Sequence, residues 1–133
     1  MKTLIVAAAV VEHNGAFLVT RRLHGTHLAG TWEFPGGKCE DGESLKACLW
    51  REIREELGVH SLVGDELFRT THDYPDRCIE LHFFATTLDG EPVPQLGQQM
   101  QWVPRERLSD LEFPPADAAL IRKLMSASAF RTH

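Results

Sequence analysis

Three glutamate side chains, Glu52, Glu55 and Glu56, have the spacing that places them on one face of a helix. At about 100° per residue they share an arc about 100° wide, so their carboxylates project together. Because like charges at i and i+4 destabilise a bare helix, this crowding calls for a counterion. Mg²⁺ and Mn²⁺ prefer carboxylate oxygens and keep waters and substrate phosphates as their other ligands. The cluster therefore indicates a metal–phosphate site, and a solvated acidic helix face is the alternative.

The segment that carries these glutamates has a fixed pattern of other residues. Residues 37–59 read GKCEDGESLKACLWREIREELGV. They match every fixed position of the Nudix box, which is G-x5-E-x7-R-E-U-x-E-E-x-G-U with U a bulky aliphatic residue. The chain therefore resembles the Nudix hydrolases, which hydrolyse a nucleoside diphosphate linked to a further moiety. The resemblance implies an α/β fold of the Nudix type, an α/β/α sandwich with a mixed β-sheet.

The resemblance also implies how the site holds its metal. Glu52, Glu55 and Glu56 are expected to ligate Mg²⁺ or Mn²⁺, and the backbone carbonyl of Gly36 is expected to be a further ligand. One of the three glutamates is also expected to act as the base that activates water, and we choose Glu52. The chemistry requires water in line with a phosphorus atom and neutralised phosphate oxygens.

Three neighbouring charged residues are expected to support this site. By the family's pattern, Glu43 supports the metal shell and Arg51 orients a glutamate through a bidentate pair. Lys38 follows the glycine turn, where it can meet a charged phosphate. An ordinary surface charge is the alternative for Arg51 and for Lys38.

Segments outside the box extend the resemblance over nearly the whole chain. They are Thr20–Arg22, Glu33–Lys38, Tyr74–Arg77 and Phe113–Asp117. They are similar to the MutT branch, which cleanses the nucleotide pool by converting 8-oxo-dGTP to its monophosphate and pyrophosphate. The resemblance implies that Arg22 contacts nucleotide phosphate and that Phe34 and Arg77 border the purine pocket. For Phe34 and Trp32, core packing is an equal alternative.

Two positions depart from the MutT pattern. MutT has asparagine where this chain has Asp117, and an ionised aspartate only accepts hydrogen bonds, so it repels the guanine O6 unless it is protonated or displaced. Aspartate also occurs there in CTP/5-methyl-dCTP pyrophosphohydrolases, where it suits the cytosine amino group. MutT carries a further metal-binding glutamate where this chain has Leu96. That ligand is either absent or supplied from elsewhere, such as by a glutamine through water.

These patterns predict a Mg²⁺-dependent pyrophosphohydrolase of (deoxy)nucleoside triphosphates, with 8-oxo-dGTP as the first candidate substrate. The nearest alternative is a CTP/5-methyl-dCTP pyrophosphohydrolase. ADP-ribose or dinucleoside-polyphosphate hydrolysis remains open because the box is common to all. A Nudix-fold module that binds nucleotide without catalysis is a different class, and its box is usually degraded, whereas this box is intact.

Composition limits the remaining function classes. The 133 residues suffice for one domain, which we assign to 1–133, and the net charge of −5 argues against stable nucleic-acid binding. Residues 1–11 contain an apolar stretch, which Glu12 and His13 cut short, so a strand is favoured over a signal peptide, and no run suits a membrane span. Three cysteines, Cys39, Cys48 and Cys78, predict reduced thiols in a cytoplasmic protein. We expect a monomer.

Local patterns predict the elements that must position the site. Ser44 and Gly58 predict a helix between them that ends at about Leu57. Asn14-Gly15 predicts a hairpin, and Pro35-Gly36-Gly37 predicts a break. The expected strands are Thr3–Val11, Ala16–Arg21, Trp32–Phe34, Leu62–Thr71, Cys78–Leu88 and Gln101–Val103. We further expect a helical turn at Pro104–Leu108, a helix at about Ala116–Met125 and a frayed tail over residues 126–133.

Overall fold

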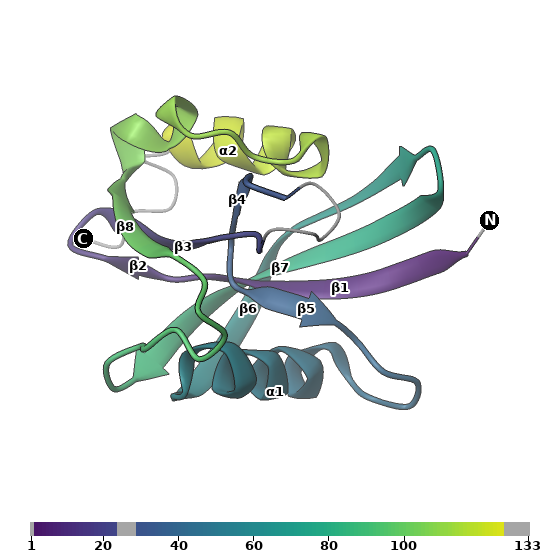
Figure 1. Cartoon of the computed structure of the whole chain (residues 1–133), viewed down its shortest axis with the longest axis horizontal. Helices are drawn as coiled ribbons and strands as arrows, with labels where there is room; N and C mark the ends of the chain where they lie inside the picture. Colours follow the sequence, from purple (N-terminus) through teal and green to yellow (C-terminus); the bar gives the residue numbers. More distant parts are fainter. Residues whose placement is uncertain (1, 24–28, 127–133) are drawn as a thin grey trace.

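The computed structural model describes residues 2–23 and 29–126, and a mixed four-stranded β-sheet runs through its centre (Figure 1). Its strands, in order across the sheet, are β5 (Gly36–Lys38), β1 (Thr3–Val10), β7 (Arg77–Asp89) and β6 (His60–Tyr74). Strands β1 and β7 are parallel, whereas β5 pairs with β1 and β6 pairs with β7 in antiparallel fashion. The central strand β1 therefore links the box segment to the long β6–β7 hairpin.

A second, smaller sheet lies next to the first. It is antiparallel and contains β2 (Glu12–His13), β3 (Ala16–Arg21), β4 (Trp32–Glu33) and β8 (Met100–Pro104), with β8 paired to β3. Asn14 and Gly15 join β2 to β3 with φ values of 52° and 78°, the left-handed conformation that a two-residue hairpin turn requires. The predicted hairpin is confirmed.

Helix α1 (Leu45–Leu57) has the bounds that the sequence predicts. The Ser44 hydroxyl accepts a hydrogen bond from the Ala47 N–H at 3.1 Å, and Gly58 ends the helix with φ of 67°. These contacts satisfy backbone groups that every helix end leaves without a partner in the helix. The apolar stripe of α1 packs on the mixed sheet, so the adjacent carboxylate face remains available to the site.

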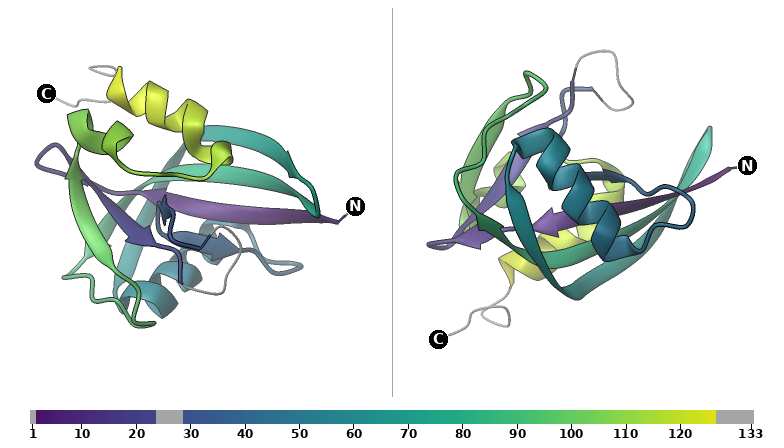
Figure 2. Two further views of the ribbon diagram at one scale, coloured as in Figure 1. Left: turned by 45° about the horizontal axis from the view of Figure 1, so that its top comes forward. Right: turned by 90° about the horizontal axis from the view of Figure 1, so that it is seen from below.

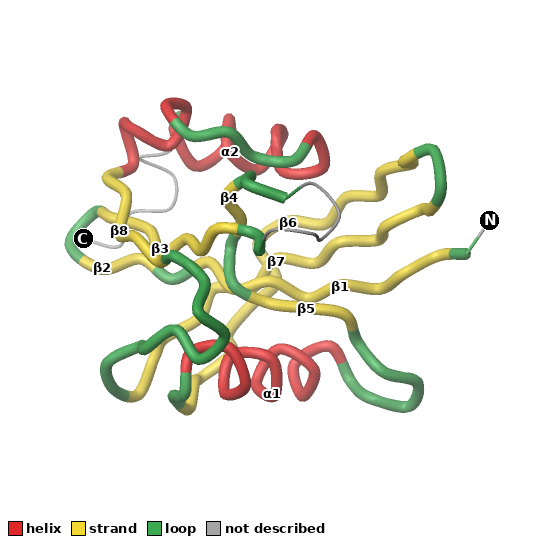
Figure 3. Tube along the Cα trace, viewed as in Figure 1, coloured by secondary structure: helices red, strands yellow, loops and turns green. Residues whose placement is uncertain are grey.

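Alternation along β1 builds an apolar core on each side of the sheet. Ala7 and Ala9 pack with α1, whereas Ala8 and Val10 pack with the second helix, α2 (Ala118–Met125). Figure 2 and Figure 3 show α1 and α2 on opposite sides of the strands. This is the predicted α/β/α sandwich with a mixed sheet. Two short 3₁₀ helices, η1 (Arg105–Asp110) and η2 (Pro115–Asp117), precede α2.

The predicted break at Pro35-Gly36-Gly37 is wrong in part, because Gly36 and Gly37 belong to strand β5. Gly36 pairs with Ala8, and Gly37 pairs with Ala7. A Cβ atom on Gly36 would overlap the backbone of Ala7 and Ala8, so glycine permits the close approach of the two strands. The glycines therefore bring the box segment against β1 instead of turning the chain away from it.

The prediction of three reduced thiols is also wrong. Cys39 and Cys48 form a disulfide with a Cα–Cα distance of 5.2 Å, and Cys78 is free. The disulfide ties the loop after β5 to the first turns of α1, a proximity that linear spacing does not reveal. The predicted frayed tail lies almost wholly outside the described residues. Within residues 2–23 and 29–126, no helix has the length and apolarity to span a membrane.

Candidate active site

Arg51 organises the acidic face of α1. Its guanidinium group donates to both carboxylate oxygens of Glu43, at 2.7 and 2.9 Å. It also donates to Glu52 at 3.1 Å and to Glu55 at 3.2 Å. A bidentate pair fixes the plane of the guanidinium, and these hydrogen bonds hold the pKa of Glu43 down at about 2. These hydrogen bonds are consistent with the expected role of Arg51, which is to orient a glutamate of the site.

Glu56 lies deeper than the other carboxylates of the helix. Burial raises its pKa to about 9, and the negative charges of Glu33 and Glu52 add to the rise. A hydrogen bond with the backbone of Gly36 acts in the opposite direction. Such a carboxylate ionises only when a cation arrives to balance it. This chemistry fits a bound divalent metal.

Glu52 lies beneath strand β5. A Cβ atom on Gly37 would overlap the Glu52 carboxylate, so the glycine leaves room for it. Burial raises the pKa of Glu52, and the charge of Arg51 opposes this rise. The close approach of β5 and α1 therefore puts Glu52, the expected base, beside Gly37 of β5.

The protein groups at this site suit a metal ion that takes only part of its ligands from the protein and the rest from water and substrate. Within the described chain, no three histidine, cysteine or acidic side chains are close enough to hold a metal ion on their own. Mg²⁺ usually takes one or two carboxylates and completes its octahedron with waters and substrate phosphates. Glu56 and Gly36, which share a wall of one cavity, are the two groups that fit such a partial set.

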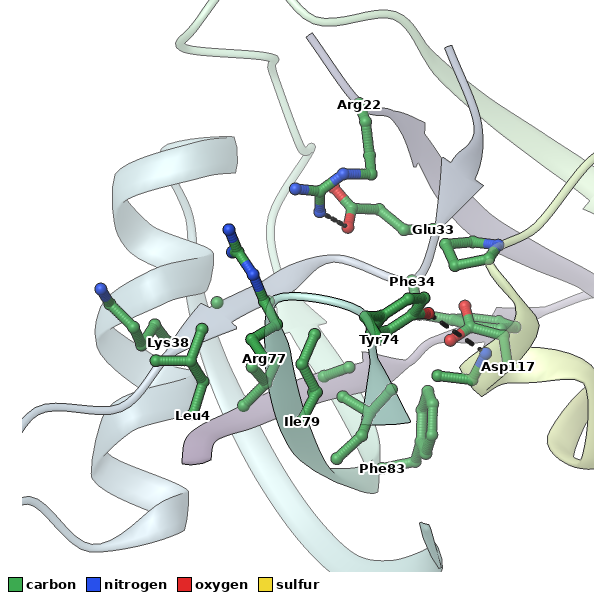
Figure 4. Close-up of a pocket in the computed structure, with 17 residues that line it drawn as sticks. Leu4, Arg22, Glu33, Phe34, Lys38, Tyr74, Arg77, Ile79, Phe83 and Asp117 are labelled. Atoms are coloured by element: carbon green, nitrogen blue, oxygen red, sulfur yellow. Dashed lines mark hydrogen bonds and ion pairs between the residues drawn. The ribbon is translucent and has the colours of Figure 1, made fainter. Parts of the chain in front are cut away.

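A cavity of about 300 Å³ adjoins Gly36 and Gly37 of β5. It brings together the expected substrate-binding residues Arg22, Phe34, Arg77 and Asp117, and also Gly36 and Lys38. Figure 4 shows that Lys38 and Arg77 lie towards one end and Asp117 towards the other. Aromatic and aliphatic side chains of β6 and β7 form its floor. An apolar pocket with a few convergent polar groups is the usual form of a small-molecule site.

Phe34 combines the two roles that the sequence left open. Its side chain is buried, stacks on Phe113 with ring centroids 5.7 Å apart, and meets Phe83 edge-on at 6.0 Å. It nevertheless lines the cavity. Phe34 is therefore a core residue that also forms a pocket wall. Trp32 packs against the same core and does not line this cavity.

Asp117 is only 4% exposed and lines the same cavity. It precedes α2, but its side chain makes no capping hydrogen bond, which disfavours the role of a simple helix cap. Burial, with a smaller contribution from the negative charge of Glu33, raises the pKa of Asp117 to about 7 against the opposing positive charge of Arg22. Near neutral pH, therefore, both the protonated and the ionised forms of the Asp117 carboxyl group are populated.

Two pocket residues were not predicted from the sequence. Glu33 accepts a hydrogen bond from Arg22 at 2.8 Å, and burial raises its pKa despite that arginine. Tyr74 lines the cavity beside Asp117, and its hydroxyl accepts a hydrogen bond from the Ala116 N–H at 3.4 Å (Figure 4). Both residues lie in segments that resemble the MutT branch, Glu33–Lys38 and Tyr74–Arg77, and this resemblance was the sequence signal for them.

A second cavity of about 170 Å³ contains Glu56 and Leu96, the residue that replaces a family glutamate. Leu96 is 56% exposed. The neighbouring Gln98 uses its amide nitrogen to bind the Glu56 carbonyl at 3.1 Å and its amide oxygen to bind the Leu96 N–H at 2.9 Å. Gln98 therefore holds its loop against the end of α1, and both of its amide atoms bind backbone groups.

Comparisons with known proteins agree with this geometry. The family model of the NUDIX domain matches residues 6–123. An 8-oxo-dGTP diphosphatase of Haemophilus influenzae is 36% identical, covering 94% of this chain and 93% of that protein. A CTP pyrophosphohydrolase of Escherichia coli K12 is 34% identical and covers 98% of each. The solution structure of the E. coli ORF135 protein matches with a TM-score of 0.85 at 34% identity, over 98% of this chain and 94% of that one. The chain therefore belongs to the Nudix hydrolase family.

Proposed function

We propose that the protein is a Mg²⁺-dependent pyrophosphohydrolase of (deoxy)nucleoside triphosphates, with 8-oxo-dGTP as its first candidate substrate. The observation that carries this proposal is the contact between two cavities. The cavity of about 300 Å³, called the base cavity below, and the cavity of about 170 Å³ that contains Glu56, called the carboxylate cavity below, share Arg22, Glu33 and Gly36. A nucleotide whose base occupies the first cavity extends its phosphates towards Glu56. The relative named 8-oxo-dGTP diphosphatase supports the same substrate class.

Each charged residue has a separate task in this scheme. Glu56 and the Gly36 carbonyl would hold Mg²⁺, with Glu52 and Glu55 at the same helix face, and the ion supplies positive charge for the phosphate oxygens. Glu52 accepts a proton from the attacking water. Arg51, anchored by Glu43, keeps Glu52 and Glu55 in position. Lys38 and Arg22 face the phosphates from the cavity wall.

Asp117 can recognise oxidised guanine when its carboxyl group is protonated. A protonated carboxyl donates one hydrogen bond and accepts another, as the asparagine of the MutT proteins does. It can then serve the guanine O6 and N1–H together. The burial that raises the pKa of Asp117 to about 7 supports this state at and below neutral pH.

A cytidine-type triphosphate is the second candidate, and the ionised form of Asp117 favours it. An ionised carboxylate accepts a hydrogen bond from the cytosine amino group without needing a proton. The relative named CTP pyrophosphohydrolase, which covers 98% of this chain, supports the same alternative. The substrate class also supports a location in the cytoplasm, where nucleoside triphosphates are used.

A nucleotide panel with measured pyrophosphate release tests the proposal. We expect Mg²⁺-dependent pyrophosphate release from 8-oxo-dGTP at a higher kcat/KM than from dGTP, dCTP or 5-methyl-dCTP. Hydrolysis of ADP-ribose yields AMP and ribose 5-phosphate, so it is followed by AMP formation, and we expect a lower kcat/KM for it as well. A higher kcat/KM for the cytidine nucleotides would select the second candidate. Binding of nucleotide without any release would instead identify a non-catalytic module, and full activity in EDTA would overturn the metal requirement.

A further inference from the structure

Three cavities follow one another across the candidate site. The base cavity shares Arg22, Glu33 and Gly36 with the carboxylate cavity. The carboxylate cavity in turn shares Arg21, Arg22, Leu23 and Gln98 with a third cavity of about 310 Å³. The third cavity therefore adjoins the carboxylate cavity, and among the described residues Arg22 is the one lining residue that it shares with the base cavity. A phosphate chain that runs from the base past the carboxylates ends there.

Arg21 is the charged residue that lines the carboxylate cavity and the third cavity but not the base cavity. It lies at the end of β3, next to Trp32 of β4, and its guanidinium group is stacked 5.9 Å from the centre of the Trp32 ring. Its Nε donates to the Gly30 carbonyl at 2.9 Å, and one terminal nitrogen donates to the Gln99 side chain at 3.2 Å. These contacts fix the plane of the guanidinium.

The positive charge of Arg21 has no acidic partner among the described residues, because both of its acceptors are neutral. Arg22, one residue away, is paired with Glu33 at 2.8 Å. The segment 24–28, which follows this part of the chain, reads HGTHL and contains no aspartate or glutamate. A fixed guanidinium whose charge is not balanced by a carboxylate is suited to bind an anion, and phosphate matches its donors.

We propose that Arg21 binds the terminal phosphate of the substrate and thereby selects nucleoside triphosphates over diphosphates. The inference rests on the proposed function and adds a residue that determines phosphate-chain length. In the reaction, water attacks the β-phosphorus and the bond between the bridging oxygen and the β-phosphorus breaks. A triphosphate then yields monophosphate and pyrophosphate, whereas a diphosphate yields monophosphate and orthophosphate. Only the triphosphate has a phosphate that reaches Arg21.

The test compares Arg21→Gln, Arg21→Lys and the unchanged protein on 8-oxo-dGTP with 8-oxo-dGDP and on dCTP with dCDP. Using two bases makes the result independent of base preference. For Arg21→Gln we expect kcat/KM on the triphosphates to fall at least about tenfold while the values on the diphosphates stay nearly constant, on the scale of a lost hydrogen bond to a charged group. Arg21→Lys keeps the charge and should recover most of the loss. The control Arg107→Gln removes an exposed arginine that lines none of these three cavities and should change neither value.

Calorimetric binding of inorganic pyrophosphate in the presence of Mg²⁺ provides a readout that needs no turnover. Arg21→Gln should weaken pyrophosphate binding and leave monophosphate binding unchanged. An equal loss on triphosphates and diphosphates, with no recovery by lysine, would mean that Arg21 only supports the fold of this region, and the proposal would be wrong. Unchanged pyrophosphate binding would also overturn it. A protein that hydrolyses no nucleotide but binds pyrophosphate through Arg21 would refute the proposed function alone.

Discussion

Among the residues of the site, Arg51 and Glu56 have opposite electrostatic surroundings. Arg51 is in contact with three carboxylates and with the Lys38 carbonyl at 3.2 Å. Glu56 instead lies next to further negative charge, and its pKa is raised to about 9. The arginine therefore serves to position the outer glutamates. The buried glutamate is the group that depends most on an added cation.

This difference makes Glu56→Gln the most direct test of the metal site. Glutamine keeps the shape of the side chain but can never supply the negative charge that a divalent cation requires. We expect turnover to fall at least ~100-fold, the scale observed when preorganised charge is removed from an active site. The thermal midpoint should not fall, because without a cation the buried Glu56 carboxyl, with its pKa of about 9, is already uncharged near neutral pH, so glutamine replaces one neutral group with another.

The matched control is Glu106→Gln, which changes an exposed glutamate of η1. It should alter neither turnover nor thermal midpoint. Near-normal activity of Glu56→Gln with saturating Mg²⁺ would contradict the metal role of Glu56.

Asp117→Asn tests how the base is recognised. At pH 8 the carboxyl group is mostly ionised, so asparagine should raise the ratio of kcat/KM for 8-oxo-dGTP over 5-methyl-dCTP about tenfold or more, because mispaired buried polar groups cost about 1–3 kcal/mol. At pH 6 the protonated aspartate resembles asparagine, and the effect should be smaller. Both substrates should keep their Mg²⁺ dependence. A ratio that stays within about twofold at both pH values would exclude Asp117 from base recognition.

The same variant tests the protonation of Asp117 through stability. The folded-state pKa of about 7 lies above the ordinary value of 3.8. Between these values the folded chain holds a proton that the unfolded chain releases, so this residue's contribution to stability falls as the pH rises through the window. Asparagine has no such proton. The thermal midpoint of Asp117→Asn minus that of the unchanged protein should therefore increase from pH 5 to pH 8, and a constant difference would mean that the carboxyl is ionised throughout.

At the scale of elements, the features that depend on neighbouring residues, such as helix ends, could be predicted, whereas the pairing of distant strands could not. Helix α1 was predicted with both of its ends because Ser44 and Gly58 act on backbone groups within a few residues. Strand β5 was missed because glycines usually break strands, and only its pairing with β1 makes it one. The glutamates of the site were predictable because they occupy one contiguous helix. Glu33 and Tyr74 come from different strands, and only the fold brings them into one pocket.

The disulfide joins cysteines nine residues apart, a pairing that their spacing did not predict, and it has a measurable consequence. It closes the short loop that carries Glu43, the anchor of Arg51. A cross-link over so short a loop contributes about 2–3 kcal/mol by reducing the entropy of the unfolded chain. Dithiothreitol should therefore lower the thermal midpoint of the oxidised protein.

Two cysteine variants separate this effect from other actions of the reductant. Cys39→Ser should start with a lower thermal midpoint and show no response to dithiothreitol. Cys78→Ser should respond as the unchanged protein does, because Cys78 is a free thiol. A response of equal size in Cys39→Ser would show that the disulfide does not contribute to stability.

At the scale of the whole molecule, two sheets and α1 meet around the phosphate path. The mixed sheet supplies the base cavity through β6 and β7, and α1 supplies the carboxylates. The smaller sheet supplies Arg21 and Arg22 from β3 and its end. The position of the carboxylate cavity between the other two determines which phosphorus lies next to Glu52 and Glu56.

Solvent labelling tests that arrangement directly. With the base in the first cavity and the first phosphate near Arg22, the carboxylates lie one phosphate farther along the chain, which points to attack at the β-phosphorus. Hydrolysis in ¹⁸O-water should therefore place the label in pyrophosphate and leave the monophosphate unlabelled, as mass spectrometry of both products can show. The control incubates unlabelled monophosphate and pyrophosphate with the enzyme and Mg²⁺ in ¹⁸O-water, where no exchange is expected. Label in the monophosphate would mean attack at the α-phosphorus, and the substrate would then have to lie one phosphate further from the base cavity, towards the third cavity, than its proposed position.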